Sequence, residues 1–470
     1  MRIDKISRSA AALAVTLTAL TAATAPARAA APLALNTDFN GDGYNDLAVG
    51  SPGYPGPWTS RHSGLIAVLY GGPGGFTGVE RLRPESACYI PPSGECRQWG
   101  TALAAGDLDG NGRPDLVSTG SADLQTYSWS QTYGITRQHY QSETYRSSLS
   151  VVQEDADPKP DVLGIYRDPS NGWPSLGGRH NGNAFELYRT SPTRDLTVSS
   201  AVFGDIHNDG IAEAMVIGTD RAAADNPYLW YLDDLRNPSA NPFVMGGPQA
   251  CAFPETSTLA CPRNDSKLAL GDVNGDGHRD LIMVTPSTGT INAWYGDKYG
   301  GGMYRPGFSA RNLTWLQTTA ATLTTLATGD FDGDGAAELA VGMPGAEVSG
   351  RFLAGAVALV PGSPSGPVVS ATRIISQDGV ASPGGAPAAD PIGEQSVAED
   401  LMGYGVSILD LDGDGKGELI AGVPGKNEGR GMLAIMKGTA GGVPSTAQLV
   451  RAEDIGLTAA STRLGAVILH

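Results

Sequence analysis

Short apolar runs alternate with polar turns along most of this chain, and this pattern predicts β-strands. The apolar segments 102–105 and 406–409 are each followed by an acidic turn and then by a second aliphatic or β-branched run. Short apolar runs bounded by Gly, Pro, Asn or Asp are typical of strands joined as hairpins. After the first thirty residues, no long segment has the apolar spacing of an amphipathic helix. The pattern therefore predicts an all-β fold.

The acidic turn between paired strands is itself repeated. Its best copies read Asp-x-Asp/Asn-Gly-Asp/Asn-Gly-x-x-Asp/Glu, and successive copies begin 46 to 80 residues apart. That spacing suits a four-stranded blade with connecting loops of variable length. We therefore predict one seven-bladed β-propeller over residues 30–470. The seven acidic loops, numbered one to seven in chain order, occupy residues 38–46, 107–115, 153–161, 205–213, 272–280, 330–338 and 410–418.

The two ends of the chain predict how the ring closes. Residues 464–469 resemble 404–409, the segment that precedes loop seven, but no acidic loop follows them. Loop one, in contrast, begins with little strand before it, apart from the short apolar run 33–35. A C-terminal strand that completes the first blade would remove the open sheet edges. We expect 464–469 to be that strand, with 33–35 as the alternative.

The spacing of oxygen donors in the loop suits calcium. Side chains at positions 1, 3 and 5, the backbone carbonyl at 7 and the carboxylate at 9 can surround one hard cation, and Gly at position 6 permits the turn. Five loops keep this set, so we expect five structural Ca²⁺ ions. The expected ligands are Asp38, Asn40, Asp42, Tyr44, Asp46, Asp107, Asp109, Asn111, Arg113, Asp115, Asp272, Asn274, Asp276, His278, Asp280, Asp330, Asp332, Asp334, Ala336, Glu338, Asp410, Asp412, Asp414, Lys416 and Glu418.

The other two loops depart from this set. Loop four has His207 at position 3, and imidazole is a poor ligand for a hard cation. Loop three has Gln153 at position 1, Pro158 at position 6 and Lys159 at position 7. We expect loop three to hold no calcium, and the occupancy of loop four stays open.

The net charge of the chain is explained by its loops. The full sequence carries −17, and removal of residues 1–29 would leave −20. The five intact loops contain seventeen acidic side chains, and five calcium ions would bring the charge to −10. The acidity is therefore mostly ligand, and it disfavours nucleic acid as a partner because phosphate binding needs a positive field.

The N-terminus has the features of a secretory signal. Basic residues come first, an apolar segment over 10–25 follows, and Ala27-Arg28-Ala29 fits the small-x-small rule for cleavage. The apolar segment is too short to span a bilayer, and no later segment is a membrane-span candidate. We expect residues 1–29 to be removed and the chain to be secreted, with an uncleaved anchor as the alternative.

Four cysteines fall into two local pairs. On an exported chain, such pairs predict two disulfides that staple loops, Cys88–Cys96 and Cys251–Cys261. Their spacing is not Cys-x-x-Cys, and no histidine cluster accompanies them, so a zinc site is not expected.

These motifs together resemble the FG-GAP repeat, also described as the VCBS repeat. The resemblance implies the seven-bladed calcium-binding propeller of integrin α subunits and of many bacterial exported proteins, but it implies no particular activity. The Gly-x-Pro part of the motif stands at 50–52, 342–344 and 422–424, and the eroded Phe-Gly part at Trp99-Gly100, Met402-Gly403 and Leu464-Gly465.

The sequence contains no Gly-x-Ser-x-Gly, no His-Glu-x-x-His and no P-loop motif. An aromatic stretch with hydroxyl and amide neighbours offers candidate ligand contacts at Tyr127, Trp129, Tyr133 and Tyr140. The alternative is that these residues belong to two amphipathic strands of the second blade. We expect a monomeric, non-enzymatic binding or adhesion module with an extracellular glycan or protein partner. The alternative is a polysaccharide hydrolase or lyase on the same scaffold.

Overall fold

The computed structural model divides the chain into two units, Met1–Ala31 and Pro32–His470. All described residues belong to the second unit, so the expected signal segment lies outside them. The structure describes residues 37–55, 63–83, 98–120, 123–130, 134–141, 145–153, 159–167, 174–180, 183–186, 196–208, 210, 212–220, 227–232, 235, 243–246, 261–296, 306–310, 325–383, 385 and 389–469.

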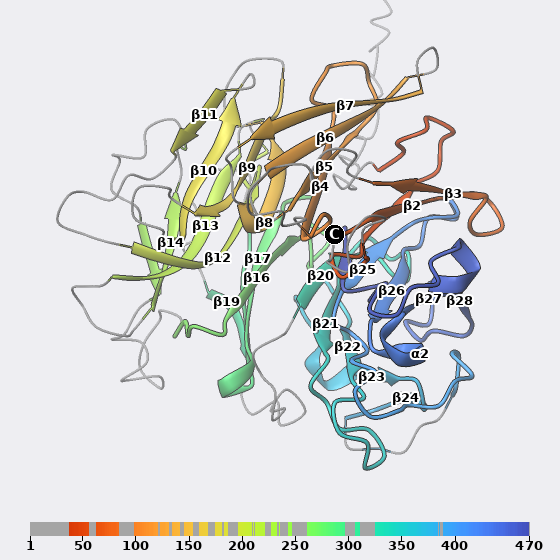
Figure 1. Ribbon diagram of the computed structural model, residues 1–470. Helices are drawn as coiled ribbons and strands as arrows, with labels where there is room; N and C mark the ends of the chain where they lie inside the picture. The colour runs from red at the N-terminus through yellow and green to blue at the C-terminus, as the bar shows by residue number, and fades with distance from the viewer. Residues whose placement is uncertain are drawn as a thin grey trace, which may run out of the picture. The chain divides into compact units, whose positions relative to one another are not determined.

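The described strands form seven antiparallel sheets, which are the blades of the propeller (Figure 1). Each blade from two to seven takes its strands from one continuous segment, and its first strand leads into an acidic loop. Blades one to four contain β29 (Val467–Ile468), β1 (Leu47–Gly50), β2 (Ile66–Tyr70) and β3 (Gly78–Leu82); β4 (Ala102–Gly106), β5 (Asp115–Thr119), β6 (Asp123–Ser130) and β7 (Gly134–Gln141); β8 (Tyr145–Val152), β9 (Asp161–Arg167), β10 (Pro174–His180) and β11 (Asn183–Glu186); and β12 (Leu196–Gly204), β13 (Glu213–Asp220), β14 (Pro227–Leu232) and β15 (Phe243–Gly246).

Blades five to seven continue the pattern, and blade six has a fifth strand. They contain β16 (Lys267–Gly271), β17 (Asp280–Thr285), β18 (Thr290–Trp294) and β19 (Pro306–Ala310); β20 (Thr325–Gly329), β21 (Glu338–Met343), β22 (Ala356–Val360), β23 (Arg373–Ser376) and β24 (Gly379–Ala381); and β25 (Val406–Leu409), β26 (Glu418–Val423), β27 (Met432–Met436) and β28 (Ala447–Arg451). The described helical segments are single turns: η2 (Pro286–Thr288), η4 (Val369–Ala371), α2 (Lys426–Gly429) and η5 (Ala452–Ile455).

The C-terminal strand closes the ring, as the sequence predicts. β29 pairs antiparallel with β1, with Val49 opposite Ile468 and Gly50 opposite Val467. Blade one is thus built from both ends of the second unit, and the end of the chain, marked C in Figure 1, lies at this blade. The expected competitor 33–35 lies outside the described residues.

The hydrophobic core is divided among the seven junctions between neighbouring blades. One buried cluster joins each successive pair of blades, including blade seven to blade one through Leu47, Leu409 and Ile420. Both faces of a blade are therefore covered, and the strands β17, β21 and β26 are buried at every position. This explains why those segments read as continuous apolar runs in the sequence.

Backbone contacts reinforce three of these junctions. A glycine in one blade forms a parallel bridge with the eroded Phe-Gly pair of the next, at Gly64–Trp99, Gly355–Met402 and Gly431–Leu464. Each of these glycines has a positive φ, and a Cβ atom would lie within 2.4 Å of the partner backbone. Only glycine permits this approach, so the motif fixes the packing of one blade on the next.

Candidate metal centres

The acidic loops connect the first and second strands of blades two to seven, and loop one leads into β1, which pairs with the closing strand β29. In the six loops that have aspartate at position 1, this side chain organises the loop by accepting backbone N–H groups. In loop one, Asp38 Oδ1 accepts from Gly41 (2.6 Å) and Asp42 (3.0 Å), and Oδ2 accepts from Gly43 (2.8 Å). Gly43, at position 6, has a φ of +95°, which explains why glycine is required there.

The carboxylate at position 9 is buried and holds the base of the loop. In six of the loops it accepts the backbone N–H of position 2, for example Phe331 to Glu338 at 2.7 Å. In blades one, five and six it also accepts an N–H from the glycine just after the third strand; in blade six, Gly362 donates to Glu338 at 3.2 Å. The sequence pattern did not reveal this second bond, which ties the acidic loop to a distant strand.

Among the described residues, carboxylate oxygens converge in three loops. They lie within 4.8 Å of one another in the sets Asp107, Asp109 and Asp115; Asp330, Asp332 and Glu338; and Asp410, Asp412 and Glu418. Loops one and five have asparagine at position 3, and its amide donates to the carboxylate at position 5, from Asn40 to Asp42 (3.0 Å) and from Asn274 to Asp276 (2.9 Å).

Burial makes the position-9 carboxyl groups poor anions without a cation. It raises the pKa of Asp280 to about 8 and the pKa of Asp46, Glu338 and Glu418 to about 7, despite the backbone N–H groups that lower these values. In loop seven, Glu418 Oε1 is buried and accepts no hydrogen bond from the described residues. A buried oxygen without a donor, close to two further carboxylates, fits a site for a hard divalent cation.

The side chain at position 7 reaches the preceding loop around the ring, which the sequence analysis missed. Arg113 of loop two donates to Asn40 O of loop one (2.8 Å), and Lys416 of loop seven lies beside Gly333 of loop six. Tyr44 of loop one lies against loop seven, where a Cβ on Gly413 would be 3.1 Å from its ring. Position 7 was expected to contribute only a backbone carbonyl, but its side chains also connect neighbouring loops.

Loop four differs from the other described loops at position 3, and the expectation that loop three holds no calcium stays a prediction. Residues 154–158 of loop three lie outside the described residues. In loop four, His207 Nδ1 lies 3.2 Å from Glu213 Oε1, which is within hydrogen-bonding distance. The imidazole thus contacts one oxygen of the position-9 carboxylate. This arrangement keeps that oxygen from a cation unless His207 moves.

The aromatic residues expected as ligand contacts are in part core residues, which corrects that interpretation. Tyr127 is fully buried and Trp129 is 7% exposed; Trp129 stacks on Phe39 with ring centroids 4.8 Å apart and donates to the hydroxyl of Tyr70. Both fill the junction between blades one and two. Tyr133 and the side chain of Tyr140 lie outside the described residues.

Two further expectations remain predictions. Cys88, Cys96 and Cys251 lie outside the described residues, so neither disulfide pairing is tested. Within the part of the chain that the structure describes, no helix has the length and apolar character needed to cross a membrane.

Comparison with known proteins identifies the repeats. Residues 38–118 and 272–341 match a family described as FG-GAP-like repeat, and residues 402–436 match the FG-GAP repeat. Integrin alpha-PS2 of Drosophila melanogaster is 40% identical over 88 residues, which are 18% of this chain and 6% of the integrin. Phosphatidylinositol-glycan-specific phospholipase D of Homo sapiens is 37% identical over 97 residues, 19% of this chain and 11% of that protein.

The similarity to these relatives is thus restricted to small parts of much longer proteins. A solved structure extends the comparison of the fold: a lectin of Agrocybe aegerita that recognises non-reducing terminal N-acetylglucosamine matches with a TM-score of 0.50 and 12% identity, over 89% of this chain and 92% of the lectin. At that identity the likeness concerns the fold alone.

Proposed function

This chain is a seven-bladed β-propeller of FG-GAP-type repeats, and from that premise we propose that it is an exported binding module whose acidic loops hold structural calcium. The observation that carries the proposal is the convergence of buried and half-buried carboxylates in loops two, six and seven. The ligand sets of loops one and five, with an asparagine at position 3, complete the five sites.

Calcium would act on stability rather than on chemistry. In blades two to seven the loops join the first two strands, so a bound ion would tie a hairpin together at one end. It would also neutralise carboxylates whose burial otherwise favours the protonated form. An ion that binds the folded chain more tightly than the unfolded chain stabilises the fold in proportion to its occupancy.

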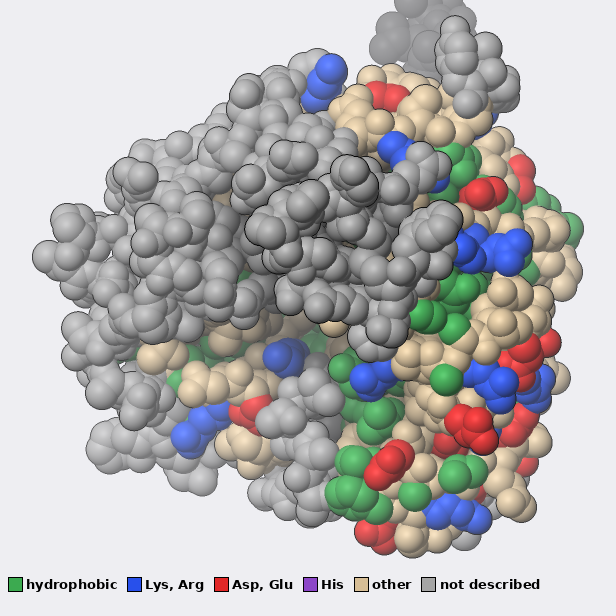
Figure 2. Space-filling model, in the orientation of Figure 1, with side chains coloured by type: hydrophobic (Ala, Val, Ile, Leu, Met, Phe, Trp, Pro, Cys, Tyr) green, Lys and Arg blue, Asp and Glu red, His purple; other side chains and the backbone are tan. Residues whose placement is uncertain are grey.

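The binding role is supported by the scaffold. A closed ring of rigid blades presents connecting loops of variable length, and sites grafted on such loops are typical of propellers. Acidic and basic side chains are intermixed on the described part of the face in Figure 2 and form no large basic patch there. A glycan or a protein fits this surface better than a nucleic acid does. The lectin of similar fold makes a glycan the first ligand class to test.

We place the protein outside the cell, after removal of residues 1–29, with Cys88–Cys96 and Cys251–Cys261 as disulfides. Both assignments rest on the sequence. Mass spectrometry of the exported chain, before and after reduction, tests them together.

A glycan array tests the binding role, with the protein applied in calcium and again in EGTA. We expect retention on a restricted set of glycans, and its loss or weakening when calcium is removed. A parallel incubation with polysaccharides tests for new reducing or unsaturated ends. Release of such ends would replace the binding role with that of a hydrolase or lyase, and retention of no glycan would redirect the search to protein partners.

A further inference from the structure

Loops six and seven have the same spacing of four acidic residues, but the residue that follows the third strand beside them differs. Strand register aligns the two blades: Leu339 pairs with Val360 in blade six, and Leu419 pairs with Met436 in blade seven. The residue that follows the paired position is Pro361 in blade six and Lys437 in blade seven. The corresponding residues in blades one and five are tyrosines, Tyr70 and Tyr295.

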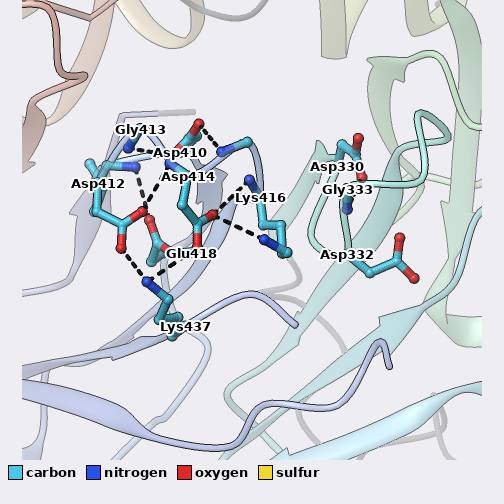
Figure 3. A network of polar contacts seen from close by, with 12 residues as sticks. Asp330, Asp332, Gly333, Asp410, Asp412, Gly413, Asp414, Lys416, Glu418 and Lys437 are labelled. Atoms are coloured by element: carbon cyan, nitrogen blue, oxygen red, sulfur yellow. Dashed lines mark hydrogen bonds and ion pairs between the residues drawn. The ribbon is translucent and has the colours of Figure 1, made fainter. Parts of the chain in front are cut away.

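Lys437 places its ammonium group on loop seven (Figure 3). Its Nζ donates to Asp412 Oδ2 and lies 3.2 Å from Asp414 Oδ2. These are the side chains at positions 3 and 5, two of those expected to bind a cation. Lys416 Nζ lies on the other oxygen of Asp414, at 3.5 Å. Lys437, which lies outside the loop, therefore bridges two of the side chains that loop seven would use to bind calcium.

Loop six has no such contact. Within the described residues, no lysine or arginine forms an ion pair with its carboxylates, and the part of Lys416 that approaches Gly333 is its aliphatic stem. The buried carboxylates also differ. Glu338 accepts an N–H from Gly362, whereas the corresponding oxygen of Glu418 accepts none from the described chain.

We propose that Lys437 is an internal counter-cation of loop seven and lowers the affinity of that loop for calcium below that of loop six. The inference rests on the calcium sites proposed above. It attributes the difference in calcium affinity between loops six and seven to the side chain of Lys437, which lies outside the acidic motif.

The physical basis is competition for the same oxygens. A divalent ion in loop seven needs carboxylates of positions 3 and 5, which the ammonium already neutralises and hydrogen-bonds. Lys437 is 48% exposed, so its flexible side chain can move into solvent when an ion enters, but the ion pairs are then lost. Without calcium, the lysine reduces repulsion among the acids of loop seven, and this loop depends less on the ion than loop six does.

Substitution Lys437→Met tests the proposal because it removes the charge and keeps an unbranched apolar stem. We expect one calcium site to bind roughly ten-fold more tightly in the variant, the order of effect of two surface ion pairs, while the other sites are unchanged. Isothermal titration calorimetry measures the site affinities. Terbium luminescence excited through tyrosine adds a local readout, because Tyr44 lies against Gly413 of loop seven.

Lys416→Met is the matched control, since among the described residues its ammonium pairs with Asp414 alone, at the longer distance. We expect a change of less than about three-fold there, because a single partly exposed ion pair at this distance contributes little. Asp412→Ala in the Lys437→Met background, which leaves no oxygen ligand at position 3, should remove the tightened site and so assign it to loop seven. Unchanged or weaker calcium binding in Lys437→Met would overturn the proposal. Absence of calcium binding in the unaltered protein would instead refute the calcium sites themselves, so the two failures are distinguishable.

Discussion

Substitution of Glu338 tests the role of the position-9 carboxyl group independently of calcium. Glu338 is buried, and it accepts N–H groups from Phe331 in its own loop and from Gly362 beyond the third strand. Glu338→Ala leaves both donors without this acceptor. A buried donor that loses its partner costs about 1–3 kcal/mol, so we expect a total loss of about 2–6 kcal/mol.

The assay is equilibrium unfolding in guanidinium chloride, with EGTA present and at pH 6. Burial raises the pKa of Glu338 to about 7, so at pH 6 the folded protein holds this group mostly as the neutral acid. The substitution then reports the lost hydrogen bonds rather than the removal of a buried charge. Glu338→Gln retains a carbonyl oxygen as acceptor and should cost less than Glu338→Ala.

Asp334→Ala provides the matched control in the same loop. Asp334 is exposed, and it accepts the N–H of Ala336 (2.8 Å). In the alanine variant, a water molecule can take the place of this carboxylate as the acceptor. We expect a loss below about 1 kcal/mol in EGTA. If Glu338→Ala and Asp334→Ala cost the same within error, the position-9 carboxyl group does not hold the hairpin in the way described here.

Three further outcomes follow from the packing and the electrostatics. Gly271→Ala should lower the free energy of unfolding by about 1–3 kcal/mol, because its Cβ would lie 2.4 Å from Thr328 Oγ1. Gly441→Ala is the control, since no atom lies within 4 Å of its Cβ position, and it should be neutral or slightly stabilising. Denaturant titration measures both variants. Gln98→Gly should raise the melting temperature slightly, since exposed Gln98 has a φ of +39° and relief of that backbone is worth up to about 1 kcal/mol; a lower value would contradict this. In EGTA, the free energy of unfolding should fall as pH rises from about 4 to about 8, because the folded protein retains a proton on Asp280 (pKa about 8) that the unfolded chain releases near 3.8; a stability that rises over this interval would refute the assignment.

Much of the architecture could be predicted from local sequence. The acidic loop specifies its own geometry, because position 1 accepts N–H groups only three to five residues away and the glycines supply positive φ. Ring closure was also predictable. The C-terminal segment 464–469 resembles the strand segment 404–409 that precedes loop seven, but no acidic loop follows it. Periodicity in a repeat protein makes each copy evidence for the others.

Contacts between distant segments could not be predicted in the same way. Tyr127 and Trp129 looked like surface aromatics because their strand alternates with Ser and Thr, yet both faces of a blade are covered by its neighbours. The pairing of Lys437 with Asp412 depends on strand register, and no local motif encodes it. The side chain at position 7 reaches another blade, and its role appears only once the loops are placed side by side.

Thermal unfolding of the protein, in excess calcium and in excess EGTA, tests the central claim most directly. Each site at a calcium concentration about a hundred-fold above its Kd adds about 2.7 kcal/mol. The three loops with converging carboxylates would together shift the melting temperature by roughly ten degrees or more. We expect a shift of that size, which magnesium at the same concentration does not reproduce. Equal melting temperatures in calcium and in EGTA would contradict a calcium-stabilised propeller.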